Sequence, residues 1–222
     1  MRKLIPYAYH GYDVDDRPIY IERTGQMQCQ ALASNKYVTM SDLLQSHIWG
    51  LENLAVLAYN KSIETGKRID SFTTIIDMNG LWWHHKDVIP LLGECTSIDN
   101  KYYPERIGKL YLINLPWIAP MLYQLVVPLV DPVTKQRIFP LAGDGRDVLT
   151  KVVSAEYLPS IYGGTCECVG KNDGLGCVPQ YPADDIEAVV ESKPDGYLTE
   201  KISYEFESML YRYILIMLYV VL

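Results

Sequence analysis

The sequence predicts an α/β fold built on a mostly parallel sheet. Segments with strand character occur at residues 19–22, 72–78, 109–114 and 137–141, with helical segments between them. Strands that alternate with helices pair in parallel, because each crossover returns the chain to the same edge of the sheet. Residues 110–115 are apolar on both alternating faces, which is typical of a strand covered on both sides.

The first strand follows a turn. Residues 7–16 are expected to form a loop, and Asp15-Asp16-Arg17-Pro18 has the composition of a turn that leads into the strand at 19–22. Proline is tolerated at the first position of a strand, so Pro18 is compatible with this assignment.

A long helix is expected next. Ser41 is the candidate N-cap, with Asp42 in the first turn, and the pattern continues to about Glu64, where Gly66 is suited to a C-cap. The residues predicted to face inward at helical spacing are Leu43, Leu44, Ile48, Leu51, Ala55 and Val56. Further helices are predicted at 86–98 and 145–153, and Gly163-Gly164 predicts a close backbone crossing rather than a phosphate loop.

The segment 117–130 is unusual. From Ala119 to Val130 it is apolar nearly all round a helical wheel, with Gln124 the only strongly polar side chain. Such a helix is expected to be covered by apolar groups on both sides. It is shorter than the roughly 20 residues needed to span a bilayer. The prolines that break it up are Pro116, Pro120, Pro128 and Pro132. We expect a hinged lid over an apolar cavity.

Composition excludes several classes of protein. The 222 residues suffice for one domain and an appendage. A net charge of −7 argues against nucleic-acid binding, which needs basic surfaces. Met1-Arg2-Lys3 is followed by too few apolar residues for a signal peptide, so a cytoplasmic location is expected. The odd number of cysteines, five, favours free thiols.

No metal or catalytic site is expected. Cys166-x-Cys168-x8-Cys177 has no fourth ligand near it in sequence and lacks the paired C-x2-C spacing of strong zinc motifs. His84 and His85 project about 100° apart on a helix, so they are assigned as solvated or helix-start residues. No histidine lies in a catalytic motif, and we expect a protein that binds without reacting.

Several motifs in a fixed order suggest a family. YYPERIGKLYLIN at 102–114, the apolar helix, DPVT at 131–134 followed by Arg137, and LP-x-x-YGG at 158–164 resemble the CRAL-TRIO lipid-binding domain, and most closely its phosphatidylinositol-transfer branch. The resemblance covers about 9–165. It implies a sheet that floors an apolar lipid pocket under a mobile helix. It also implies non-enzymatic binding and transfer of a phospholipid, transient contact with membranes, and no cofactor other than the bound lipid.

The resemblance assigns roles to individual residues. Glu105, Thr134 and Arg137 occupy the positions that contact an inositol phosphate in that branch. By chemistry alone, Arg137 can fork onto phosphate and Glu105 can accept from hydroxyls. Composition alone favours another interpretation, in which Glu105 and Arg106 form a surface ion pair and residues 131–134 are only a turn; the order of the family motifs reverses that preference. The gate residues implied are Trp117, Met121, Leu122, Leu125 and Val126.

The sequence also departs from the family pattern. The family has lysine where this chain has Arg137. The positions that correspond to the family's choline-lipid pocket are Tyr9, Tyr20, Thr74, Phe72 and Leu51. The first three match, whereas Phe72 replaces a serine and Leu51 a tyrosine. We therefore expect an inositol lipid to be preferred over a choline lipid.

We assign residues 1–168 to the lipid-binding domain, without the family's N-terminal helical bundle. Residues 169–222 are expected to form an acidic, linker-like segment and an apolar C-terminal element. The alternative function is a lipid-regulated interaction or scaffolding module of a larger protein, with a protein partner. A Rossmann-type enzyme is disfavoured, because residues 22–25 provide no glycine-rich first turn.

Overall fold

A computed structural model describes residues 1–34, 36–169 and 176–178. The expected acidic linker and apolar C-terminal element fall almost wholly outside the described residues. The strands are β1 (Tyr7–Tyr12), β2 (Pro18–Glu22), β3 (Phe72–Asp77), β4 (Ile107–Ile113) and β5 (Ile138–Pro140). The α-helices are α1 (Cys29–Ala33), α2 (Met40–Thr65), α3 (Ile89–Tyr102), α4 (Ala119–Val126), α5 (Pro132–Gln136) and α6 (Arg146–Val152). Short 3-10 helices occupy Thr24–Gln26, Trp83–Val88, Val127–Leu129 and Ser160–Tyr162.

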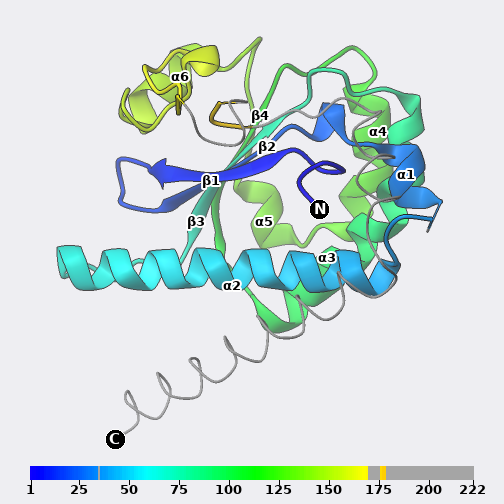
Figure 1. Ribbon diagram of the computed structural model, residues 1–222, viewed down its shortest axis with the longest axis horizontal. Coiled ribbons are helices and arrows are strands. Elements are labelled where there is room, and N and C mark those ends of the chain that lie inside the picture. The colour runs from blue at the N-terminus through cyan, green and yellow to red at the C-terminus, as the bar shows by residue number, and fades with distance from the viewer. Residues whose placement is uncertain (35, 170–175, 179–222) are drawn as a thin grey trace, which may run out of the picture.

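The five strands form one sheet in the order β1-β2-β3-β4-β5 (Figure 1). β1 pairs with β2 antiparallel, and the other three pairs are parallel. The mostly parallel α/β sheet predicted from the sequence is therefore confirmed. The strand predicted at 19–22 is β2, which begins one residue earlier, at Pro18, because the missing N–H of proline costs least at a strand end.

The two faces of the sheet carry different layers. α2 runs along one face and α6 lies on the opposite side (Figure 1). Leu51 and Leu54 of α2 pack with Phe72 of β3. On the other face Leu149 of α6 packs in a cluster with Ile75 and other strand residues. Successive side chains of a strand point to opposite faces, which explains how one strand contributes to both layers.

The prediction that residues 7–16 form a loop is wrong. Tyr7–Tyr12 is β1, and its register places Tyr9 opposite Tyr20 of β2. The Tyr9 and Tyr20 ring centroids lie 5.6 Å apart, so the tyrosines act as the apolar face of a strand. Gly11, at φ 69°, interrupts the pairing and hides the alternating pattern in the sequence.

The N-cap of helix α2 lies two residues earlier than predicted. It is Thr39 rather than Ser41, because the Thr39 and Asp42 side chains each accept the other residue's backbone N–H. Gly66 is the C-cap, as predicted, in the left-handed conformation at φ 70°. Val56, expected to face inward, is 42% exposed, because the buried stripe runs instead through Leu51, Leu54 and Ala58.

The helix predicted at 86–98 is divided into two parts. A 3-10 helix covers Trp83–Val88, and α3 follows from Ile89 to Tyr102. Pro90 lies in the first turn of α3, where its missing N–H costs nothing. The second part therefore starts as a new helix.

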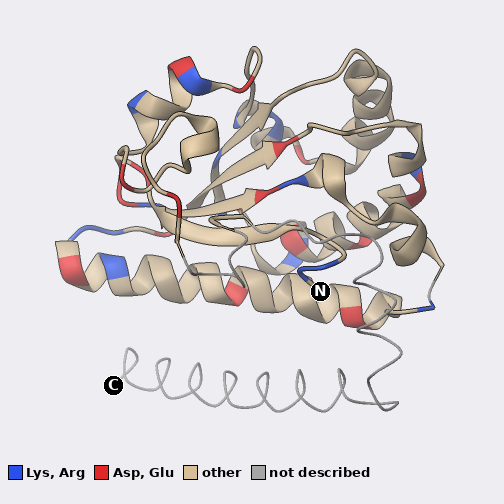
Figure 2. Cartoon of the chain, turned by 45° about the horizontal axis from the view of Figure 1, so that its top comes forward, with Lys and Arg blue, Asp and Glu red and all other residues tan. Residues whose placement is uncertain are grey.

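The expectation that α4 is covered on both sides is also wrong. Leu122 is buried beside Leu81 and Ile118, whereas Met121 and Leu125 are 50% and 45% exposed. The sequence has no Lys, Arg, Asp or Glu from 110 to 130, so α4 is tan throughout in Figure 2. α4 is thus a surface helix with an apolar outer face. Among the described helices, none has both the length and the apolar character that crossing a bilayer requires.

Candidate functional site

Glu105 and Arg137, predicted to bind the head group, lie together at one edge of the sheet. Arg137 Nη2 is 3.2 Å from Glu105 Oε2, and Nη1 donates to the backbone oxygens of Glu105 at 3.0 Å and Ile107 at 2.7 Å. Glu105 has φ 60°, a left-handed conformation that is uncommon for residues other than glycine. Arg137 therefore holds an unusual backbone position as well as pairing with the carboxylate.

This pair lines a cavity of about 460 Å³. The cavity is lined by Arg17, Arg68, Asp70, Ser71, Pro104, Glu105, Arg106, Gly108 and Arg137. Four of these residues are arginines. Three of them form ion pairs, which are Arg17 with Asp15, Arg68 with Asp70 and Arg137 with Glu105. The fourth, Arg106, donates a hydrogen bond to the backbone oxygen of Asp70. The cavity therefore combines fixed positive charge with carboxylate acceptors, a lining suited to a phosphate that carries hydroxyl groups.

Sequence reasoning missed three of the four arginines. Arg17 precedes β2 directly, Arg68 lies just before β3, and Arg106 precedes β4, as Arg137 precedes β5. The N-terminal ends of parallel strands lie along the same end of the sheet. These residues, which are far apart in sequence, therefore meet there. A basic residue before each predicted parallel strand is the signal that would have found them. Gly108 permits this arrangement, because a Cβ there would lie only 3.0 Å from Arg17.

Thr134 lies one helical turn before Arg137 but does not line the cavity. It belongs to α5, whose N-cap is Asp131, and Asp131 Oδ1 accepts the backbone N–H groups of Val133 and Thr134. Partial burial raises the pKa of Asp131, but hydrogen bonds from the Thr134 side chain and these two amides outweigh it and lower the pKa below its usual value. Thr134 thus has a local partner in this structure.

The residues predicted for the choline-lipid pocket do gather, between α2 and the sheet. Leu51 and Phe72 are buried in one cluster, with Tyr9 and Tyr20 packed against it, and Thr74 pairs with Tyr20 in the β2–β3 register. Burial raises the pKa of both tyrosines, so their hydroxyls stay protonated. The Thr74 hydroxyl is buried and has no hydrogen-bond partner, which is costly for a polar group.

This interface is closely packed. The cavity that Leu51 and Phe72 line has a volume of about 10 Å³. That is about the space one water molecule requires, so no acyl chain fits there in this conformation. The predicted closed lipid cavity stays a prediction.

The outer face of the predicted gate continues into a neighbouring loop. Trp117, 73% exposed, packs edge to face against Trp82, with ring centroids 5.8 Å apart. Of the five gate residues, Trp117, Met121 and Leu125 are exposed, Val126 is half-buried and Leu122 is buried. The exposed members and Trp82 form an apolar surface, which we call the tryptophan face. Tryptophan is enriched where proteins meet membrane interfaces.

His84 and His85 differ in environment. His84 is exposed, whereas His85 is buried at the start of the Trp83–Val88 3-10 helix. His85 Nε2 lies 3.0 Å from the Thr24 carbonyl and Nδ1 lies 3.1 Å from the backbone N–H of Trp82, so the neutral ring donates to the first and accepts from the second. The two histidines were predicted to be solvated or helix-start residues. His84 is the solvated one, and His85 is the helix-start residue.

Comparison with known proteins places this arrangement in a family. Residues 2–164 match the CRAL/TRIO domain. The chain is 31% identical over 170 residues to "Sec14 cytosolic factor" of Schizosaccharomyces pombe and 34% over 177 residues to "SEC14 cytosolic factor" of Kluyveromyces lactis. It is 32% identical over 176 residues to "Phosphatidylinositol/phosphatidylcholine transfer protein SFH4" of Arabidopsis thaliana.

The alignments cover 76%, 78% and 78% of this chain. They cover 59%, 58% and 28% of the three relatives, so the chain spans little more than half of the fungal proteins and less of the plant one. The match to the family domain covers most of the sequence and includes the whole sheet. The chain therefore belongs to the CRAL/TRIO domain family.

Proposed function

We propose that this protein binds one phospholipid and transfers it between membranes, with an inositol phospholipid as its preferred ligand. The observation that carries the proposal is the Arg137–Glu105 pair, which lines a cavity with three further arginines. An inositol phosphate offers both an anion for guanidinium groups and hydroxyls for a carboxylate. A choline head group carries a fixed positive charge, for which this lining is less suited.

Binding would exchange partners within the cavity. Phosphate oxygens would take donors of Arg137 that now reach the Glu105 carboxylate, which would then accept from inositol hydroxyls. Thr134 would join by turning its hydroxyl away from Asp131. The guanidinium is planar and can form two parallel hydrogen bonds to phosphate. Arginine in place of the family's lysine therefore retains the positive charge and also allows bidentate binding.

Loading a lipid would also require movement of α4. A two-chain phospholipid has about 30 methylenes at roughly 0.8 kcal/mol each, so its chains must be enclosed. The packed interface at Phe72 leaves no room for them, so the chains need a space that opens when α4 moves. We propose that Pro116 and Pro132 flank the moving segment and that the tryptophan face docks on the bilayer. The protein would act in the cytosol, touch membranes transiently and bind lipid without chemical reaction.

A second candidate function is a lipid-regulated interaction module. The tryptophan face favours it, because an exposed apolar surface can equally well take a protein partner. Transfer distinguishes the two: a module of this kind would bind lipid but would not move it between vesicles.

The test is competitive loading from vesicles that contain phosphatidylinositol and phosphatidylcholine, followed by lipid extraction and mass spectrometry. We expect wild type to retain mainly the inositol lipid and Arg137→Ala to lose roughly tenfold or more of it, because a hydrogen bond to a charged group contributes about 1.5–3 kcal/mol. Arg146→Ala, which removes an arginine of α6 that pairs with Asp144, is the matched control. Equal loading of both lipids, or an unchanged Arg137→Ala, would contradict the head-group assignment.

A further inference from the structure

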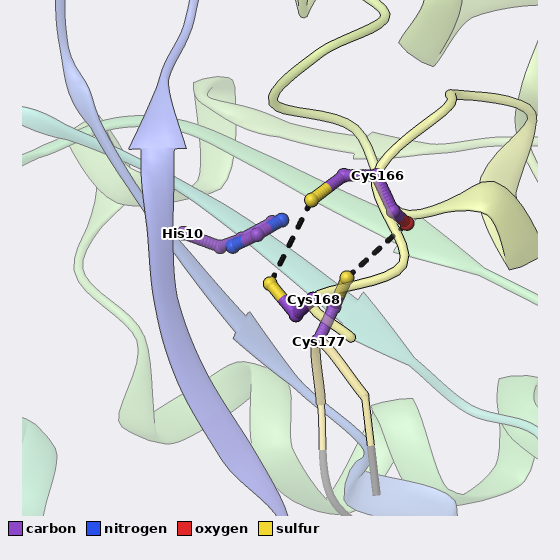
Figure 3. Close-up of side chains that lie close together, drawn as sticks. All are labelled: His10, Cys166, Cys168 and Cys177. Atoms are coloured by element: carbon purple, nitrogen blue, oxygen red, sulfur yellow. Dashed lines mark hydrogen bonds between the residues drawn. The ribbon is translucent and has the colours of Figure 1, made fainter. Parts of the chain in front are cut away.

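Four side chains that are far apart in sequence converge beside β1. They are His10, Cys166, Cys168 and Cys177, and their ligand atoms all lie within 4.8 Å of one another (Figure 3). Cys166 Sγ and Cys168 Sγ are 3.6 Å apart. Thiolates that bind zinc at 2.3 Å in a tetrahedron are separated by about 3.8 Å. The two sulfur atoms are already at the spacing of a tetrahedral zinc site.

The backbone is shaped to bring these sulfur atoms together. Gly164 crosses so close to Leu158 that a Cβ would collide with the Leu158 carbonyl oxygen, and Cys166 then pairs with this segment through its amide. Cys168 has φ 47°, a left-handed conformation that is unfavourable for a residue with a side chain. Gly176, at φ 79°, turns the chain just before Cys177. Cys168 and Gly176, both with positive φ, thus lie at or next to two of the ligand positions.

The cluster is partly sheltered from solvent, since Cys177 is buried and the other three residues are half-buried. Cys177 is 8% exposed and belongs to the main hydrophobic core, with Cys166 and Cys168 packed against it. His10 comes from the opposite direction, on the edge strand β1, and its ring points at the sulfur atoms in Figure 3. Three sulfur ligands and one imidazole on a closed site form the Cys3His set of structural zinc sites.

We propose that His10, Cys166, Cys168 and Cys177 bind one Zn²⁺ ion as a structural site. Zinc is the favoured metal, because thiolates and imidazole in tetrahedral geometry select it over hard cations. Binding displaces one proton from each of the three thiols and leaves no coordination position for water or substrate. The site has no catalytic role.

The ion would add a coordinate link between two parts of the chain that already share the main hydrophobic cluster, in which Ala8 of β1 packs with Cys177. His10 lies in the N-terminal strand, whereas Cys166, Cys168 and Cys177 follow the end of the domain match at residue 164. Coordination would fasten this last segment to the edge of the sheet. Sequence spacing shows no fourth ligand because His10 precedes the cysteines by the length of the domain.

The experiment measures metal in the full chain, purified under reducing conditions and exchanged into buffer without chelator. We expect about one zinc per chain by atomic emission. After chelator removes it, Co²⁺ should produce the visible bands of a tetrahedral site and a thiolate-to-cobalt charge-transfer band, and Zn²⁺ should abolish both. These readouts use the wild-type protein, so they do not depend on a variant that folds poorly.

Variants locate the site. Cys168→Ser and Cys177→Ser should bind no cobalt at stoichiometric concentration, and zinc should raise the Tm of wild type but not of these variants. Cys95→Ser removes a cysteine outside the cluster and should keep the full signal. Cys29→Ser tests the other cluster of potential ligands among the described residues, Cys29 with His84 and His85, and should also keep it.

Three results would overturn the proposal. The first is metal-free protein that shows no cobalt spectrum. The second is a stoichiometric metal that Cys29→Ser removes and Cys168→Ser does not. The third is a Cys166–Cys168 disulfide in the reduced preparation, seen as a loss of two hydrogens by mass spectrometry. Because each result leaves lipid loading unchanged, failure here is distinguishable from failure of the proposed function.

Discussion

The Tyr162 hydroxyl donates a hydrogen bond of 2.8 Å to Asp77 Oδ2, and both residues are buried. This bond joins the YGG motif to the end of β3. Asp77 Oδ1 accepts from the Asn114 side chain at 2.8 Å and from the backbone of Asn79 at 3.0 Å. Burial, and then the charge of Asp77, raises the pKa of Tyr162, so the phenol remains a donor. The YGG motif is therefore held to β3 by a buried hydrogen bond between Tyr162 and Asp77.

Tyr162→Phe tests this contact. The change removes one donor from a buried carboxylate and should lower the free energy of unfolding by about 1–3 kcal/mol. Urea denaturation measures the effect. Tyr102→Phe, at a position that is 63% exposed, is the control and should be nearly neutral. Equal stability of Tyr162→Phe and wild type would show that the bond contributes nothing.

Two adjacent threonines of β3 provide a second test. The Thr73 hydroxyl donates to Asp13 Oδ2 at 2.6 Å, whereas the Thr74 hydroxyl has no partner. Thr73→Val should cost about 1–3 kcal/mol of unfolding free energy, because it leaves a buried carboxylate short of a donor. Thr74→Val should be neutral or stabilising, because it removes a buried polar group that has no hydrogen bond.

Lipid loading adds a functional readout to the same pair. If the Thr74 hydroxyl is kept for a head group, Thr74→Val should retain less phospholipid than wild type while it gains stability. Mass spectrometry of extracted lipid, alongside urea denaturation, measures both. Destabilisation of both variants to the same extent would refute this interpretation of Thr74.

The tryptophan face predicts a membrane phenotype. Leu125→Asp should weaken binding to vesicles by tenfold or more, because an aspartate within hydrocarbon costs about 2.5–3.5 kcal/mol. Its stability should be nearly unchanged, since Leu125 is 45% exposed. Vesicle sedimentation measures the binding. Ile63→Asp makes the same change at a 70% exposed position on α2, and a similar loss in that control would contradict a role for α4 in docking.

The buried His85 predicts a dependence of stability on pH. Burial lowers the pKa of His85 and the nearby His84 adds to this, while the Trp82 and Thr24 carbonyl oxygens, which can accept from a protonated ring, act in the opposite direction. The unfolded chain therefore binds a proton near the usual value of about 6.5, and the folded chain only at lower pH. Because the unfolded state then binds more protons, stability is lost as pH falls below about 6.5.

Urea denaturation at about pH 7.5 and 5.5 measures this loss. His85→Asn cannot titrate and should lose less stability than wild type between the two conditions. His84→Asn changes an exposed ring and should behave nearly as wild type does. The same loss in wild type and His85→Asn would assign the pH dependence to other groups.

The sequence by itself determined the alternation of strands and helices, the start of β2 to within one residue and the end of α2 at Gly66. These features depend on local backbone chemistry, namely which φ values and N–H groups a residue allows. It also gave the residue types of the head-group pair. It failed at β1, where tyrosines with polar tips concealed an apolar face, and at α4, whose composition does not reveal that one side faces solvent.

Only the tertiary structure decided which distant residues meet. Arg17, Arg68 and Arg106 join Arg137 because parallel strands place their N-terminal ends at one edge. His10 lies close to Cys166, Cys168 and Cys177 because the antiparallel edge strand β1 lies beside the segment that carries the cysteines. Such neighbours arise from sheet order and chain crossing, which depend on packing of the whole domain rather than on spacing along the sequence.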